Sequence, residues 1–135
     1  MNGRFQIAIH IMTLLTKADD KLLSSEFIAS SINSNAALVR KELSNLRNNG
    51  LITSKEGATG GYALGKDAAL IRLSDIYQTV KQQSVLGQAK NLPNPACPVG
   101  RQINEHLYTL YKEVEDSLAE KLGSKTLAEF AGQFE

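Results

Sequence analysis

The chain has 135 residues, a formal net charge of +1 and a single cysteine, and 42% of its residues are hydrophobic. This length suits one domain, or a small domain with an appendage, and the apolar content is enough for one core. One cysteine excludes an internal disulfide, and no run is long and apolar enough to span a bilayer. Residues 4–16 are amphipathic and lack a signal-peptide cleavage pattern, so we expect a cytoplasmic protein without a membrane partner.

The charge is unevenly distributed along the chain. Residues 1–81 hold 10 Lys and Arg against 7 Asp and Glu, a net +3, whereas residues 82–135 hold 5 against 7, a net −2. A basic excess in the first part permits contact with a polyanion such as DNA, although it is modest. Two copies of the chain would double this basic surface.

A helix–turn–helix pattern begins at Ser24. Ser24 or Ser25 can cap a first helix with apolar residues at helical spacing, and the short polar side chains of residues 33–35 then favour a turn. A second helix follows with apolar residues from Leu38 to Leu46, and Gly50 is its stop. Its other face carries polar and basic residues that we interpret as a DNA-reading face: Asn35, Arg40, Lys41, Ser44, Asn45 and Arg47. A merely solvated helix would show a similar pattern.

The next segment favours the DNA-binding interpretation. Residues 51–55 are strand-like, residues 56–61 form a loop with three glycines, and residues 62–64 can return as the partner strand. A helix–turn–helix followed at once by a glycine-tipped hairpin is the order of a winged helix. The sequence therefore predicts a mainly α fold with a small β-wing.

The remaining helices are predicted from periodicity and capping residues. A first helix over residues 3–16 is dense in apolar positions, and Ser74 is expected to cap a helix that runs to about Val80. Residues 82–100 read as a loop that holds the only cysteine, Cys97. A long helix is expected over residues 101–122, followed by a capping box at residues 126–129 that starts a short helix reaching Phe134. We divide the chain into a winged domain at 1–81, a loop at 82–100 and a dimerisation segment at 101–135.

The long helix has more apolar surface than the winged domain needs. Its apolar residues form a continuous stripe on a helix of about 30 Å, and this stripe can pack on the chain's own first helix or on a second copy. Because the winged domain already closes a core, we predict a homodimer. The interface residues would be Ile103, Leu107, Leu110, Val114 and Leu118.

With these residues identified, the chain resembles the Rrf2 family of bacterial winged-helix transcriptional regulators. The resemblance rests on residues 4–5, on the LRNNGLI run at 46–52, on Gly60-Gly61-Tyr62, on residues 73–77 and on residues 126–129. It implies a homodimeric transcription factor, usually a repressor. Each subunit would place one recognition helix in a major groove of the operator DNA, and the long C-terminal helices would cross.

Specific DNA contacts follow from the chemistry of the side chains. Asn35 and Asn45 can pair with adenine edges, and Arg40 can bind guanine or phosphate. Lys41 and Lys55 suit phosphates, and Arg4 is a weaker candidate for the same role. Glycines at the wing tip let its backbone approach closely: Gly57, Gly60 and Gly61. Many family members carry a basic residue before the wing tip where this chain has Glu56, so we expect the helix to contribute more than the wing.

No cofactor is predicted. Cluster-binding members of the family hold three cysteines in the loop before the long helix, and this chain offers Cys97 alone. No ligand-spaced group of His, Cys or carboxylate residues supports a zinc site. Cys97 instead has two interpretations: a redox-sensitive thiol next to a helix N-terminus, or a small packing residue between prolines.

Other functions stay open with less support. We find no nucleophile–base pair, carboxylate dyad or phosphate-binding loop, so the sequence does not indicate an enzyme. A winged-helix module that binds a protein partner is the main rival, favoured by the low net charge and Glu56. A regulator that senses a small molecule, without a redox role, is the other.

Overall fold

The computed structural model describes residues 3–81, 86 and 92–135, and every structural statement below refers to these residues. They fold into α1 (Arg4–Ala18), α2 (Ser25–Ile32), α3 (Ala36–Asn48), β1 (Ile52–Lys55), β2 (Gly61–Leu64), the 3-10 helix η1 (Ala68–Leu70), α4 (Leu73–Val80), α5 (Pro98–Gly123) and α6 (Leu127–Ala131). The order helix, helix–turn–helix, two-stranded wing, helix confirms the predicted winged-helix fold.

Short polar side chains set the boundaries of α2 and α3. Ser24 accepts a hydrogen bond from the Phe27 backbone N–H and so caps α2, as predicted. Asn33 ends α2 in the left-handed conformation, with φ of 56°. Asn35 then caps α3 through its side-chain oxygen, which accepts from the backbone N–H groups of Ala37 and Leu38. The turn between the two helices is therefore fixed by asparagine chemistry.

The wing is a two-stranded antiparallel hairpin with Ile52 opposite Leu64 and Lys55 opposite Gly61. Gly57 has φ of 106°, a backbone conformation that side chains rarely adopt, and it turns the chain at the tip. Leu23, just before α2, adds an antiparallel bridge to Tyr62, with N···O distances of 2.8 and 3.0 Å. This bridge ties the base of the wing to the start of the helix–turn–helix.

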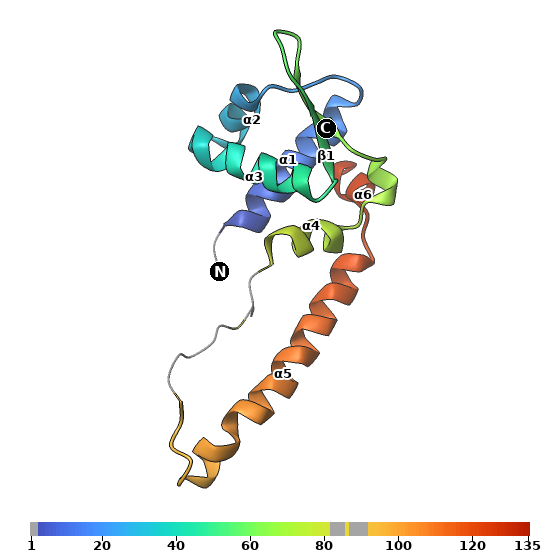
Figure 1. The fold of residues 1–135 in the computed structure, drawn as a ribbon. Helices are drawn as coiled ribbons and strands as arrows, with labels where there is room; N and C mark the ends of the chain where they lie inside the picture. Colours follow the sequence, from blue (N-terminus) through green and yellow to red (C-terminus); the bar gives the residue numbers. More distant parts are fainter. Residues whose placement is uncertain (1–2, 82–85, 87–91) are drawn as a thin grey trace.

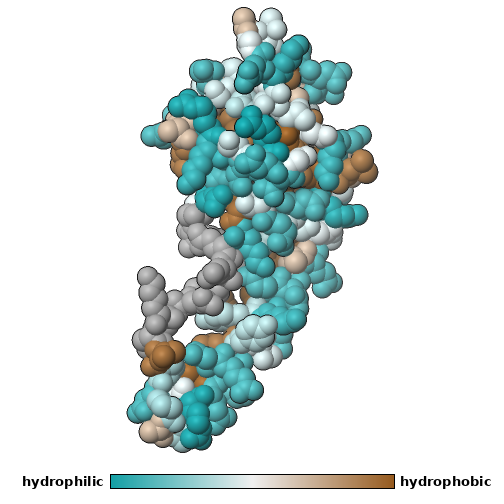
Figure 2. Space-filling view, viewed as in Figure 1, coloured by the Kyte–Doolittle hydropathy of each residue, from teal (hydrophilic) through white to brown (hydrophobic). Residues whose placement is uncertain are grey.

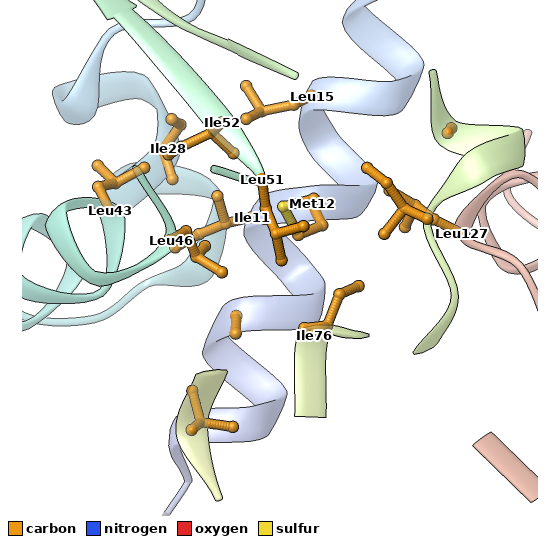
Figure 3. Close-up of a cluster of buried hydrophobic side chains, with 14 of the residues drawn as sticks. Ile11, Met12, Leu15, Ile28, Leu43, Leu46, Leu51, Ile52, Ile76 and Leu127 are labelled. Atoms are coloured by element: carbon orange, nitrogen blue, oxygen red, sulfur yellow. The ribbon is translucent and has the colours of Figure 1, made fainter. Parts of the chain in front are cut away.

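Helix α1 is the central packing element of the core. Ala8, Ile11 and Met12 are fully buried, and Leu15 nearly so. Figure 3 shows Ile11, Met12 and Leu15 of α1 surrounded by Ile28, Leu43 and Leu46 from the helix–turn–helix on one side and by Ile76 and Leu127 on the other. A single core thus joins α1 to α2 and α3 on one side and to α4 and α6 on the other.

Helices α4 and α6 close the core from the C-terminal side. Leu127, the first residue of α6, is fully buried, and its backbone N–H donates to the Ile71 carbonyl at 2.7 Å. The predicted capping box is confirmed, since Thr126 and Glu129 exchange hydrogen bonds with each other's backbone N–H. The chain therefore returns from α5 to the domain and docks there with a short helix.

Several predicted boundaries are wrong by a few residues. Helix α1 continues two residues beyond Thr16, and α6 ends at Ala131 instead of reaching Phe134. Ser74 does not cap α4, because the helix starts at Leu73, two residues earlier than predicted, and its N-cap is Arg72, whose backbone N–H donates to Asp75. Helix α5 begins at Pro98 and not at residue 101, since a proline at the first helical position gives up an N–H that has no partner there.

Helix α5 leaves the domain and projects well beyond it (Figure 1). It has 26 residues, which corresponds to a length of about 39 Å. Its C-terminal part packs on α4, whereas none of its residues is fully buried. No helix in the described part of the chain is both long and apolar enough to cross a bilayer.

Candidate nucleic-acid interface

The outer face of α3 carries exposed basic and polar side chains. Four of the residues predicted to read DNA are exposed on this helix: Arg40, Lys41, Ser44 and Arg47. The inner face of the same helix buries Val39, Leu43 and Leu46, so the core fixes which side of α3 faces solvent. A basic outer face held by a rigid inner face can present donors to base edges and phosphates.

Asn35 lies at the start of this face, but its side chain already caps α3. Its oxygen Oδ1 accepts the capping hydrogen bonds from Ala37 at 2.7 Å and from Leu38 at 3.4 Å. Reading an adenine edge requires both an acceptor and a donor from one amide. Asn35 therefore offers its NH2 group alone to a ligand, which suits an acceptor such as phosphate.

Asn45 and Arg4 point into the protein and not toward the outer face of α3. The Asn45 side chain is half-buried, and its Nδ2 donates to the Thr79 carbonyl at 2.8 Å and to Glu42 at 3.3 Å. The Arg4 guanidinium contacts the fully buried Glu42 carboxylate at 2.7 Å, and these hydrogen bonds raise the pKa of Arg4 above its ordinary value. Neither partnership was predicted, and both side chains already have partners within the protein.

The wing lies next to α3 and is joined to it by a direct bond. Arg47 Nη1 donates to Ser54 Oγ of β1 at 3.0 Å. Lys55 and Glu56 are both exposed at the approach to the wing tip, where the carboxylate of Glu56 would face phosphates if the tip approached DNA. The approach to the wing tip therefore carries one cation, Lys55, followed directly by one anion, Glu56.

Two of the wing glycines are required by the protein's own backbone. A Cβ at Gly60 would overlap the Lys55 carbonyl, and one at Gly61 would lie 2.7 Å from the Leu23 carbonyl oxygen. A Cβ at Gly57 would meet nothing, so that position depends on its positive φ instead. The structural reason for Gly60 and Gly61 is thus hairpin closure and the bridge to Leu23, in addition to any approach to DNA.

Sequence reasoning missed two exposed apolar side chains in the helix–turn–helix. Phe27 of α2 and Leu38 of α3 are 54% and 40% exposed, although both are among the apolar residues whose spacing predicted these helices. The exposure of Leu38 could have been predicted from the spacing of Val39, Leu43 and Leu46, which defines the buried side of α3. Leu38 lies about 100° away from Val39 around the helix. Exposed apolar side chains at such a place can contact a thymine methyl group.

The apolar stripe of α5 is only partly covered in one chain. Leu110 is 49% exposed, and the other predicted interface residues are half-buried: Ile103, Leu107, Val114 and Leu118. Figure 2 shows a few hydrophobic side chains along one edge of α5 in the lower part of the molecule, whereas most of the visible face of this helix is hydrophilic. Glu115 in the C-terminal half of α5 pairs with Lys81, the residue that follows α4, at 3.5 Å.

Cys97 is the N-cap residue of α5 and is exposed. The backbone N–H groups of Gly100 and then of Val99 lower the pKa of its thiol, although no regular capping hydrogen bond forms. Next to it, Pro98, Val99, Gln102, Ile103 and His106 line a shallow pocket of about 260 Å³. The thiol is therefore accessible and biased toward the nucleophilic thiolate.

Metal ligands are not gathered anywhere in the described ranges. No group of three or more His, Cys, Asp or Glu side chains there could hold a metal ion. The chain has a single cysteine, so it also lacks the thiolates that a subunit iron–sulfur cluster needs. These residues do not fit a resident metal centre.

A helix–turn–helix with a basic outer face, an adjoining wing and a projecting helix defines a winged-helix transcriptional regulator. Residues 1–133 match the model of the Rrf2 family, described as iron-dependent transcriptional regulators. The chain belongs to the Rrf2 family. The iron in that description finds no ligand group among the described residues of this member.

Relatives and solved structures agree with this assignment. The chain is 38% identical to YwnA of Bacillus subtilis (strain 168), named as an HTH-type transcriptional regulator, over 127 residues that cover 94% of this chain and 93% of YwnA. It is 33% identical to the regulator IscR of Yersinia pestis over 86 residues, which cover 64% of this chain and half of IscR. CymR, the global cysteine regulator of B. subtilis, has a structure similar to this one, with a TM-score of 0.74 and 26% identity over 100% of this chain and 98% of CymR.

Proposed function

We propose that this protein is a homodimeric, sequence-specific DNA-binding repressor. The observation that carries the proposal is the presence of two surfaces in one chain: the exposed basic face of α3 beside the wing, and the partly exposed apolar stripe of α5. The first suits a DNA groove, and the second suits a second copy of the chain. Family membership supports a DNA partner.

In the proposed complex α3 lies in the major groove. Arg40 and Ser44 reach base edges, whereas Lys41, Lys55 and the NH2 group of Asn35 bind phosphates. Arg47 is held between the helix and the wing by its bond to Ser54 and aligns the two. Gly57 allows the wing backbone to approach the DNA closely.

Dimerisation would place two such helices on one operator. Two α5 helices that cross along the stripe from Ile103 to Leu118 would cover apolar surface that one chain leaves in water. Each monomer contributes only a modest basic excess, so the second copy also doubles the number of phosphate contacts. Repression would follow when the dimer occupies DNA that RNA polymerase requires.

The proposal is tested by fluorescence anisotropy with labelled DNA from upstream of the protein's own gene and unlabelled random DNA as competitor. We expect saturable binding that resists the competitor and weakens steeply with added salt. Duplexes selected from a randomised library provide a second probe if the upstream DNA is not an operator. Binding that is absent, or equally tight on random DNA, from both sources would favour a winged-helix module for a protein partner.

A thiol-redox response is a second element of the proposal, favoured by the exposure of Cys97 and its lowered pKa. Diamide would take two electrons and two protons from the Cys97 thiol and a second thiol, which joins the two sulfurs in a disulfide. The second thiol is either a small thiol or the partner subunit's Cys97. If Cys97→Ser leaves diamide-induced DNA release unchanged, the response does not depend on this residue, and the pocket beside it becomes the candidate site for a small-molecule signal.

A further inference from the structure

A partly buried ion pair joins α1 to the inner side of the recognition helix, with the carboxylate fully buried and the arginine side chain 33% exposed. Arg4 Nε donates to Glu42 Oε2 at 2.7 Å, and Arg4 Nη2 donates to Glu42 Oε1 at 3.2 Å. Glu42 is 0% exposed and lies between the turns of α3 that bury Val39 and Leu46. A carboxylate thus occupies a core-facing position of the helix that reads DNA.

The same carboxylate takes part in a connection to α4. Asn45, three residues along α3, donates from Nδ2 both to Glu42 Oε1 at 3.3 Å and to the Thr79 carbonyl at 2.8 Å. Arg4 belongs to α1, Glu42 and Asn45 belong to α3, and Thr79 belongs to α4. One polar network therefore connects the recognition helix with the two helices behind it.

Stability alone does not explain a charge at this position. Burying an ion pair incurs a desolvation penalty, and apolar side chains of similar volume often replace such pairs without loss of stability. Apolar contacts, however, are not directional and tolerate sliding or rotation of a helix. Two guanidinium–carboxylate bonds and an amide bridge have preferred directions, so they define the rotation of α3 about its axis.

We propose that Arg4 and Glu42 act as a positioning pair that sets the orientation of α3, and that Arg4 supports DNA binding through Glu42 without touching phosphate. This inference rests on the proposed DNA-binding function. The proposal gives Glu42 a role inside a DNA-binding domain. A carboxylate on the DNA-binding surface would instead repel the phosphates of the DNA. The proposal also gives Arg4 a different role from the phosphate contact expected from the sequence.

The test is a double-mutant cycle with Glu42→Leu, Arg4→Met and the double variant, measured on a duplex selected by the wild-type protein from a randomised library. Leu and Met have volumes close to those of the residues they replace, so the double variant should melt at or above the wild-type temperature. Glu42→Gln keeps the side-chain shape and an acceptor, and should show the smallest loss of affinity. Lys41→Met is the matched control for a true phosphate contact.

Each single variant should lose specific affinity by about tenfold or more, because a rotated helix weakens several base contacts at once. The double variant should lose no more than Glu42→Leu alone, and its salt dependence should match the wild type. Lys41→Met, by contrast, should reduce the salt dependence. Wild-type affinity and specificity in the stable double variant would overturn the proposal. The proposal would also be overturned if the affinity losses of the two single variants multiplied to about a hundredfold in the double variant and Arg4→Met reduced the salt dependence. Those results would identify Arg4 as a phosphate contact.

A measurement without DNA keeps the two proposals separate. If the wild-type protein selects no duplex, the proposed DNA-binding function fails, and amide hydrogen exchange of α3 then decides the role of the pair. Faster exchange in α3 of the double variant, at an unchanged melting temperature, supports positioning, because the helix then opens locally while the global fold persists. Unchanged exchange in α3 overturns it.

Discussion

The Arg47 guanidinium of α3 donates to the Ser54 hydroxyl of β1 at 3.0 Å. Both side chains are exposed, so the bond adds little to the stability of the fold. Its consequence is geometric, since it links the C-terminal half of the recognition helix to the first strand of the wing. Together with the bridge between Leu23 and Tyr62, it makes the helix–turn–helix and the wing one continuous surface.

Arg40 is the most direct test of that surface. It is exposed on α3 and forms no ion pair with another described residue, which leaves its guanidinium available to a ligand. Arg40→Ala should lower specific affinity by ~1–3 kcal/mol if the side chain reads a base, with little change on random DNA. Anisotropy titrations on both duplexes measure this. An equal loss on the two duplexes would identify a phosphate contact, and Lys112→Ala on the exposed side of α5 should change neither.

Gly61→Ala tests the link between the wing and the helix–turn–helix. Gly61 has φ of 152°, and an added Cβ would lie 2.7 Å from the Leu23 carbonyl oxygen, so the bridge to Tyr62 must shift. We expect a loss of about 1–3 kcal/mol in the free energy of unfolding, measured by urea denaturation. Thr59→Ala at the exposed wing tip is the control and should stay within about 0.5 kcal/mol of the wild type. A stable Gly61→Ala variant would mean that the bridge adapts without strain.

Local rules in the sequence were sufficient for the winged helix. Capping by Ser24, the asparagines around the turn, the glycine loop and the capping box at Thr126 act over a few residues, and each was found where the pattern predicted it. The boundary at Arg72 was missed because α4 is positioned by tertiary contacts: its first residue donates a backbone hydrogen bond to Lys125, far along the chain. Propensity alone does not register such a contact.

The DNA-reading face was predicted less completely than the fold. Helical periodicity located the exposed side of α3 and assigned Asn45 to it, and Arg4 was expected to contact phosphate. Both residues also have partners within the protein that periodicity cannot identify, since Arg4 and Glu42 are 38 positions apart and Asn45 and Thr79 are 34 apart. Glu42 received no role at all, because a charged residue in a helix is ordinarily assigned to solvent.

The thiol of Cys97 should ionise at a lower pH in the folded protein than in the unfolded chain. The Gly100 and Val99 N–H groups favour the thiolate, so folding gains a contribution from this group above the unfolded pKa and loses it as the pH falls through the folded pKa. Iodoacetamide alkylation of native protein should therefore reach half its maximal rate at a lower pH than alkylation of protein in urea. Coincident pH profiles would show that the helix N-terminus does not act on the thiol.

The apolar stripe of α5 predicts a mutation that separates assembly from folding. Leu107 is half-buried on α5 and is not among the side chains of the hydrophobic core or those packed against it, so a charge there does not enter the monomer core. In a dimer, Leu107→Glu would place two carboxylates in an apolar seam, where burying an unpaired charge is strongly unfavourable. We expect a monomer by analytical ultracentrifugation, with the melting of the winged domain retained and operator affinity greatly reduced because a single recognition helix remains. Thr109→Glu adds the same charge on the opposite, exposed side of the helix and should leave the dimer intact. A Leu107→Glu protein that remains a dimer would show that the chains associate through another surface.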